Sequence, residues 1–276
     1  TYRNRDHALK YDISANVSTL KNKVTSLGIG KNSYITGAYA TYVGQEIGKF
    51  YGWIYEGIAR TQDELDGHAT QQGASVGDCL YKDISGPNGE PDGVIDAYDQ
   101  TVLGSGLPKV NFGLSTHMEY KGFDLNISTY GVLNYHVSDD IYNSLNSCYG
   151  YGNKEVGMLD ANRWSEDGST YLSSVPRTYA ANNATLGWND LFSSRKIQNA
   201  AYWKIANVEL GYNFPDKWFG GYVSGVRLYV SAQNLYTFTG YHGYNVDYAG
   251  GTFTPGYNFC SFPSARTFMC GLHFTF

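Results

Sequence analysis

Four aspartates between positions 83 and 99 have the residue type and glycine spacing of a calcium-binding loop. Asp83, Asp92, Asp96 and Asp99 stand in the segment YKDISGPNGEPDGVIDAYDQTVLG, and Ca²⁺, which takes roughly six to eight oxygen ligands, is the candidate cofactor. Residues 44–108 carry eleven acidic and three basic residues, so a bound cation would relieve repulsion. However, eight residues separate Asp83 from Asp92, more than in the usual pattern, and no Glu closes the loop. The segment therefore indicates either a Ca²⁺ site or an Asp-rich turn with solvated carboxylates.

A catalytic site is not indicated by the remaining reactive residues. The six histidines are scattered along the chain, and no HExxH, GxSxG or phosphate-binding loop occurs. The four cysteines show no spacing typical of metal ligands. We therefore expect that the protein is not an enzyme.

The composition indicates that the elements that position the candidate residues are β-strands. The 276 residues include 26 Tyr and 33 Gly, and 16% of them are charged, below the ~25% typical of soluble domains. This composition favours β-structure with many turns. The net charge of −5, with no cluster of Lys and Arg, argues against a nucleic-acid partner.

Six segments alternate apolar and polar residues with the period of a β-strand. In the last of them, RTFMCGLHFTF, the apolar positions are Phe268, Cys270, Leu272, Phe274 and Phe276. Each segment has about the 9–11 residues that a tilted strand needs to cross a bilayer. The predicted strands occupy residues 9–20, 109–121, 123–133, 202–215, 224–236 and 266–276.

The connections between the predicted strands alternate between short and long. The turns after Tyr120 and Phe214 are short, whereas residues 21–108, 135–200 and 238–265 form long connections. Outer-membrane barrels combine short periplasmic turns with long extracellular loops in this way. Six strands cannot close around a lumen, and unpaired edges in hydrocarbon are costly. We therefore predict an all-β arc of about six strands from a large antiparallel transmembrane β-barrel with long extracellular loops.

The order of several sequence blocks resembles the C-terminal part of the SusC-like TonB-dependent transporters (RagA/SusC family) of Bacteroidetes outer membranes. The resemblance covers nearly the whole chain, and the order of the blocks is more specific than any single one. The blocks are GQEIGKFYGWIYEGI (44–58), the aspartate-rich segment (81–113), YKGFDLNI (120–127), NRW (162–164), WKIANVELGYNFP (203–215), VRLYVSAQNLYTFTGYHGYNVD (226–247) and RTFMCGLHFTF (266–276).

This resemblance implies a plugged barrel of about 22 strands that imports oligosaccharides or peptides across the outer membrane. It implies as partners a SusD-like lipoprotein over the extracellular mouth, TonB as the energy source and the lipid bilayer. Residues 1–276 would be the C-terminal barrel part, with the plug domain and the N-terminal strands supplied by another polypeptide. The aspartate segment is longer than the compact form usual in this family, which weakens the inherited metal site.

The terminal strand resembles the signal that the barrel assembly machinery reads. The predicted membrane anchor and assembly signal consists of its outward residues Phe268, Leu272, Phe274 and Phe276. Because short and long connections alternate, the last strand ends on the side of the short turns, so we expect the C-terminus in the periplasm. The simpler alternative is an ordinary edge strand.

Ligand contacts are expected from aromatic side chains of the loops and the lumen face, because flat rings with a polar tip suit sugars and peptides. The alternative to transport is a soluble or surface carbohydrate-binding β-protein or adhesin, since a β-sandwich also alternates. The candidate ligand residues are Tyr149, Tyr151, Trp164, Trp188, Tyr241, Tyr244 and Tyr257.

Overall fold

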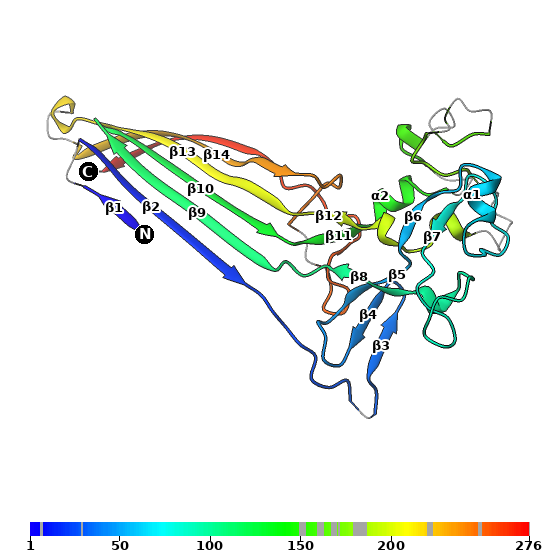
Figure 1. Ribbon diagram of the computed structural model, residues 1–276. Helices are drawn as coiled ribbons and strands as arrows, with labels where there is room; N and C mark the ends of the chain where they lie inside the picture. Colours follow the sequence, from blue (N-terminus) through cyan, green and yellow to red (C-terminus); the bar gives the residue numbers. More distant parts are fainter. Residues whose placement is uncertain are drawn as a thin grey trace.

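The computed structural model has two parts, a long curved sheet and a layer of loops at one end of it (Figure 1). It describes residues 1–5, 8–28, 30–148, 153–158, 163–166, 170, 172–178, 187–219, 223–247 and 250–275. In this part of the chain, no helix has the length and apolar character needed to cross a membrane.

The curved sheet is antiparallel throughout and contains all six predicted strands. Each long strand pairs with its neighbours in the order β1-β2-β9-β10-β13-β14-β16. A short strand that the sequence analysis did not predict, β1 (Tyr2–Asn4), lies against the first long one. The long strands are β2 (Leu9–Thr19), β9 (Val110–Tyr120), β10 (Phe123–Leu133), β13 (Tyr202–Phe214), β14 (Gly225–Thr239) and β16 (Thr267–Thr275).

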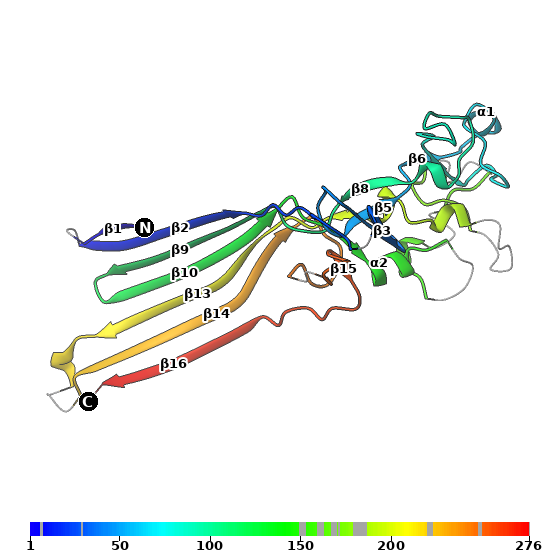
Figure 2. The ribbon, with the colours of Figure 1, turned by 90° about the horizontal axis from the view of Figure 1, so that it is seen from below.

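The sheet is an open arc, as Figure 2 shows. Within the described residues, β16 pairs with β14 alone, and β1 and β2 form the opposite edge. The prediction of an arc with antiparallel strands is therefore confirmed.

Short connections lie at one end of the arc. Lys121 and Gly122, with φ of 49° and 89°, join β9 to β10 in a two-residue hairpin turn. The β13–β14 connection contains one turn of 3-10 helix, η6 (Asp216–Trp218). The last described residues of β16 reach this same end (Figure 2).

The long connections form the loop layer at the other end, which we define as the described residues of 20–109, 134–201 and 240–266. Its sheets are small. One combines β3 (Ser33–Thr36), β4 (Tyr39–Tyr42), β5 (Lys49–Gly52) and β8 (Thr101–Ser105), and another pairs β6 (Tyr55–Ile58) with β7 (Cys79–Tyr81). A third places β11 (His136–Asp139) between β12 (Gln198–Asn199) and β15 (Tyr257–Asn258). The helical turns are α1 (Gln62–Asp66), α2 (Asp140–Leu145), η1 (Ala97–Asp99), η2 (Val156–Met158), η4 (Gly187–Asp190) and η5 (Ser194–Lys196).

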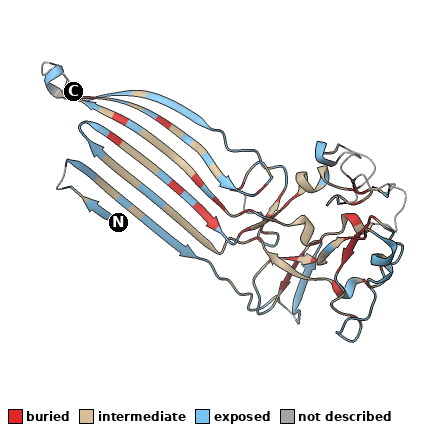
Figure 3. Ribbon diagram, turned by 45° about the horizontal axis from the view of Figure 1, so that its top comes forward, coloured by how far each residue is buried: buried red, intermediate tan, exposed pale blue. Residues whose placement is uncertain are grey.

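Buried side chains gather mainly in the loop layer and where it meets the sheet (Figure 3). One cluster joins Val132 and Tyr202 of the sheet to Tyr135, Val137 and Tyr241 of the loops. A second cluster contains Cys79, Tyr81 and Ile95. The first cluster thus joins the second and third long connections, and Trp188 and Leu191 of the second connection pack against the second cluster, which belongs to the first connection.

Polar contacts between distant loop segments fix this layer further. The buried Asp78 carboxylate accepts bonds from Arg177 Nε at 2.7 Å and from Asn189 Nδ2 at 2.8 Å. The backbone of Gly106 lies so close to that of Pro255 that an added Cβ would be 1.9 Å from the Pro255 carbonyl oxygen. The loop layer is therefore a packed unit in which segments about 100 residues apart touch.

Candidate functional site

The outward face of the sheet is apolar and exposed. Alternation places Leu228 and Leu272, a register pair, on this face, where they are 43% and 58% exposed. Phe268 on the same strand is 69% exposed. Figure 3 shows exposed residues recurring along the strands of the arc. An uncovered apolar face of this length needs an apolar environment outside the chain.

Aromatic side chains border this apolar face at both of its ends. At the short-turn end, the ring centroids of Phe123 and Tyr212 are 4.7 Å apart. At the loop end, Trp203 stacks on Phe238 at 5.2 Å. About nine residues separate Trp203 from Tyr212 on β13, which at ~3.3 Å per residue and a tilt of about 40° rises roughly 23 Å. This height is close to the ~25 Å apolar band between the aromatic girdles of membrane barrels.

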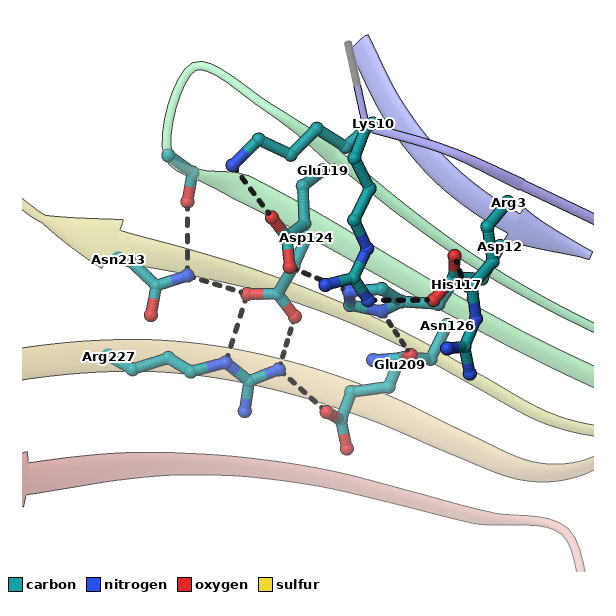
Figure 4. Close-up of polar contacts among 12 residues, drawn as sticks. Arg3, Lys10, Asp12, His117, Glu119, Asp124, Asn126, Glu209, Asn213 and Arg227 are labelled. Atoms are coloured by element: carbon teal, nitrogen blue, oxygen red, sulfur yellow. Dashed lines mark hydrogen bonds and ion pairs between the residues drawn. The ribbon is translucent and has the colours of Figure 1, made fainter.

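The opposite face carries a network of charged groups centred on Arg227 (Figure 4). Arg227 Nε donates to Asp124 Oδ1 at 3.0 Å, and its Nη2 donates to Asp124 Oδ2 at 2.5 Å and to Glu209 Oε1 at 2.7 Å. Asn213 Nδ2 donates to the same Asp124 carboxylate at 2.9 Å. The side chain of Asp124 is only 7% exposed. Three strands, β10, β13 and β14, are therefore cross-linked by charge on this face.

A second polar group continues the network toward β2. The His117 ring nitrogens lie 2.7 Å from Asn126 Oδ1 and 2.9 Å from Glu119 Oε1. Lys10 pairs with Glu119 at 3.8 Å (Figure 4). Near them, Asp12 pairs with Arg5. Such a face suits an aqueous interior, because charged groups in contact with hydrocarbon would be strongly destabilising.

Glycines on the polar face make room for the large side chains of this network. A Cβ on Gly211 would lie 2.6 Å from both the Arg227 guanidinium and the Asp124 carboxylate. A Cβ on Gly271 would lie 2.6 Å from the ring of Tyr229. A side chain at either position would therefore have to displace the side chain that lies across the glycine.

A β-bulge at Ala206 decides which face Lys204 occupies. β10 has no residue opposite Ala206, because Ser128 pairs with Asn207 and Thr129 with Ile205. Strict alternation would put Lys204 on the same face as Leu210, but the bulge turns it to the polar face. There its Nζ donates to Asp247 Oδ2 at 2.6 Å, and its side chain is 4% exposed. The sequence analysis missed the ion pair between Lys204 and Asp247. The signal that could have revealed it is a lysine at a position where strict alternation expects a lipid-facing residue.

Beside this pair lies a pocket of about 360 Å³ on the polar face. Besides Lys204 and Asp247, its walls include hydroxyl groups of Thr237 and Tyr244 and the amide of Asn245. Hydroxyl, amide and charged groups around an aromatic ring are suited to a polyhydroxylated or peptide ligand.

The predicted ligand aromatics do not gather around one cavity. Tyr149 and Tyr151 lie outside the described residues. Tyr244 is exposed and lines the pocket just described. Trp188 donates from Nε1 to the Gln72 carbonyl at 3.1 Å, and Tyr257 stacks on Phe259.

The other two predicted aromatics are core residues. Trp164 is buried against Gly77. The Tyr241 hydroxyl donates to the Asp139 carboxylate, and Asn258 Nδ2 donates to that hydroxyl at 2.8 Å. Burial, followed by the bond to Asp139, raises the pKa of Tyr241 well above its usual value.

The four predicted calcium ligands are mostly engaged by backbone amides. Asp99, fully buried, accepts from Ile84 N at 2.8 Å and Asp96 N at 2.9 Å. Asp83 Oδ2 accepts from Gly93 N, while its Oδ1 is buried with no hydrogen-bond partner. Asp96 and Asp92 accept from amides two residues further on. In the described part of the chain, no three acidic, His or Cys side chains are placed to hold a metal. The donor set thus fits Ca²⁺ poorly, and calcium binding in this loop stays a prediction.

Three of the four predicted anchor residues lie on the outward face of β16. Phe268, Leu272 and Phe274 pair in register with Ala232, Leu228 and Val226 of β14 and are exposed. The fourth, Phe276, lies outside the described residues. Their role in assembly stays a prediction.

The cysteines differ sharply in environment, which gives a test of the loop layer. All four are free; Cys79 is fully buried and Cys260 is exposed. Burial raises the pKa of the Cys79 thiol to about 12. At pH 8 its thiolate fraction is then roughly 10⁻⁴, and only the thiolate is alkylated. We predict that iodoacetamide modifies Cys79 at least ~100-fold more slowly than Cys260, as measured by peptide mass spectrometry. Equal rates would contradict the buried placement.

The comparisons with known proteins show similarity along nearly the whole chain. No protein-family model matches. The TonB-dependent receptor P3 of Formosa agariphila is 30% identical over 279 residues, which cover 95% of this chain and 26% of that receptor. The TonB-dependent receptor SusC of Bacteroides thetaiotaomicron is 25% identical over 278 residues, covering 96% of this chain and 24% of SusC.

Solved structures share the fold. The RagAB peptide transporter superposes with a TM-score of 0.75 at 20% identity, covering 98% of this chain and 27% of that chain. The RagAB peptide importer in its closed-closed state gives 0.74 at 22% identity, with coverage of 99% and 28%. The chain spans about a quarter of the length of the relatives it matches.

Proposed function

We infer that this chain, which resembles SusC-like TonB-dependent receptors along nearly its whole length, forms part of the wall of an outer-membrane transporter. The observation that carries this proposal is the two-sided sheet. One face is apolar, exposed and bordered by aromatic residues, and the other holds a charged network. A barrel wall explains both faces, because lipid would cover the apolar face and water would solvate the charged face.

Residues 1–276 are in this proposal the C-terminal part of the barrel, and the plug domain and N-terminal strands belong to another part of the assembly. Two findings support it. The chain matches about a quarter of each relative, and among the described residues the outermost strands β1 and β16 each pair with one neighbouring strand of the arc. In hydrocarbon each unpaired backbone group costs several kcal/mol, so further strands are needed to close the barrel.

The loop layer faces the outside of the cell in this proposal, and the short turns and the C-terminus face the periplasm. Barrels of this class have short periplasmic turns and long outer loops, which supports the orientation. The outward residues of β16 would then serve as the signal for the barrel assembly machinery.

The proposed partners follow from the relatives. A SusD-like lipoprotein would cover the loop layer, and TonB would act through the plug. The RagAB structures are described as a peptide transporter, and we propose an oligosaccharide or peptide cargo for this chain too. The pocket beside Lys204 and Asp247, with Tyr244 in its wall, is the proposed contact site on the polar face. The curated relatives are named receptors, and we propose no catalytic role.

Spin labels test the placement of the two faces directly. In the native complex reconstituted in vesicles, with Cys260 and Cys270 replaced by alanine, labels at Leu228 and Leu272 should collide with oxygen and be shielded from a water-soluble nickel chelate. Labels at Gln233 and His273, which alternate to the polar face and are exposed, should show the opposite preference. Aqueous accessibility at Leu228 and Leu272 would overturn the proposal.

The proposed assembly is tested by mass spectrometry of the complex purified from its native membrane in detergent. Peptides of the remaining barrel strands, on this polypeptide or on another, and a SusD-like lipoprotein should both be recovered with this chain. A detergent-independent monomer would instead favour the soluble carbohydrate-binding alternative.

A further inference from the structure

A pocket of about 290 Å³ in the loop layer contains two neighbouring cationic residues of η5. Tyr55 from β6 lines it together with Arg195 and Lys196. Tyr142, Asn143 and Asn146, on or next to α2, line it as well. The pocket thus brings together segments from two of the long connections.

The backbone holds η5 rigidly at the pocket wall. Ser194 N donates to the Trp53 carbonyl at 3.0 Å, and the Ser194 hydroxyl accepts from Tyr55 N at 3.0 Å. Ser193, the preceding residue, is buried. Arg195 therefore directly follows a residue that two hydrogen bonds tie to the first long connection, so little backbone ordering is needed on binding.

Arg195 lies among groups that are mostly neutral at pH 7. The thiols of Cys79 and Cys148 and the hydroxyls of Tyr55 and Tyr81 interact with it most strongly, burial raises the pKa of both thiols, and the cation Lys196 lies beside it. No carboxylate in the described ranges forms an ion pair with Arg195. A partly buried guanidinium among neutral groups is unfavourable unless an anion pairs with it.

The nearby carboxylate of Asp190 is already engaged. It accepts from Cys148 N at 3.1 Å and lies 3.9 Å from Lys196 Nζ. Lys196 also donates to the Asp190 carbonyl, and burial lowers the pKa of this lysine. The Asn143 side-chain amide donates to Ser138 Oγ at 3.1 Å, and the Asn146 amide donates to Glu155 Oε2 at 2.8 Å. Both amides are therefore engaged within the protein and do not serve as donors to a ligand.

We propose that this pocket binds the carboxylate of an acidic ligand, with the Arg195 guanidinium as its main contact. A planar guanidinium matches a carboxylate with two parallel hydrogen bonds. Tyr55 and Tyr142 offer ring surfaces for the uncharged part of the ligand. The volume has room for one uronic acid unit or one acidic side chain, not for a whole oligomer. This inference rests on the proposed transport function, because it assigns a charge to the cargo.

Binding is measured by titration calorimetry on the whole detergent-solubilised complex at physiological salt. Three probes are compared: trigalacturonate, a capped triglutamate peptide and neutral maltotriose. We expect one of the acidic probes to bind, and the acidic probe that binds identifies the source of the carboxylate. Arg195→Met should weaken that binding by roughly 10- to 100-fold, because a charged hydrogen-bonding partner is lost.

The controls separate the site from general effects. Lys31→Met removes one exposed positive charge from the same layer and should leave the affinity unchanged. Slow alkylation of Cys79 verifies that the loop layer is folded in each variant. If Arg195→Met is not folded by this criterion, Arg195→Lys is used instead. We expect its affinity for the acidic probe to be at least ~5-fold lower, because lysine cannot form the two parallel hydrogen bonds to the carboxylate.

Failure of both acidic probes to bind, equal binding of maltotriose, or unchanged affinity in the folded Arg195 variant would overturn the inference. The spin-label result is independent of these titrations. A correctly inserted barrel without carboxylate binding would reject this site alone, whereas aqueous accessibility of Leu228 and Leu272 would reject the transport function.

Discussion

Replacing Gly106 by alanine should open the loop layer to protease. The new Cβ would lie 1.9 Å from the Pro255 carbonyl oxygen and 2.7 Å from Gly256 N, so it meets backbone that no rotamer change can move away. Gly256, with φ of 74°, approaches the Gly106 Cα from the other side. Overpacking of this kind costs about 1–3 kcal/mol or more. We expect the initial rate of loop cleavage to rise at least ~10-fold, since cleavage tracks the population of the open form.

The matched control for this experiment is Gly240→Ala, in the same long connection as Pro255. A Cβ on Gly240 meets nothing within 4 Å, so the cleavage rate should stay close to that of the original protein. Equal cleavage of the two variants would show that the contact between the first and last long connections does not hold the layer closed.

Replacing Arg227 by methionine should destabilise the sheet by about 3 kcal/mol. The substitution leaves Asp124, whose side chain is 7% exposed, without its cation and leaves Glu209 unpaired. Breaking a buried pair by removing one partner costs about 3–5 kcal/mol, and the 24% exposure of Arg227 places this case at the lower end. The free energy of unfolding of the reconstituted complex in urea measures the effect.

Lys10→Met is the control for charge alone. Lys10 and Glu119 are 54% and 49% exposed, and exposed pairs contribute about 0–1 kcal/mol. The double variant Asp124→Asn with Arg227→Met should lose less stability than the sum of the single variants, because the two groups interact directly. If Arg227→Met cost no more than Lys10→Met, the network would have no structural role.

The arc was predictable because a sheet with different surroundings on its two faces imposes strict alternation on its sequence. The predicted strand 123–133 matches β10 residue for residue, and the other long strands differ mainly at their ends. β1 was missed because three residues with two exposed side chains carry no periodic signal. The exception on β13 is the bulge, whose mark in the sequence is a lysine at a position where strict alternation expects an apolar residue.

The loop layer was not predictable in the same way, since its contacts join residues far apart in the sequence. Nothing near Asp78 indicates that Arg177 and Asn189 will surround it. Tyr241 has the residue type of a ligand contact, but the buried Asp139 carboxylate makes it a core residue. Arg195 could not be identified from the sequence either, because only the structure shows that it lines a pocket without forming an ion pair to a carboxylate of the described residues.

The bulge at Ala206 also sets which substitutions β13 can accept. Between Asn207 and Phe214 the odd-numbered positions lie on the polar face and, apart from Gly211, should accept other polar residues, whereas before the bulge the even-numbered Lys204 lies on this face. A saturation scan of this strand should therefore show that tolerance of polar residues changes from odd-numbered to even-numbered positions at the bulge. Deleting Ala206 would remove the bulge and restore a single phase, in which Lys204 stays on the polar face with Asn207 and Glu209.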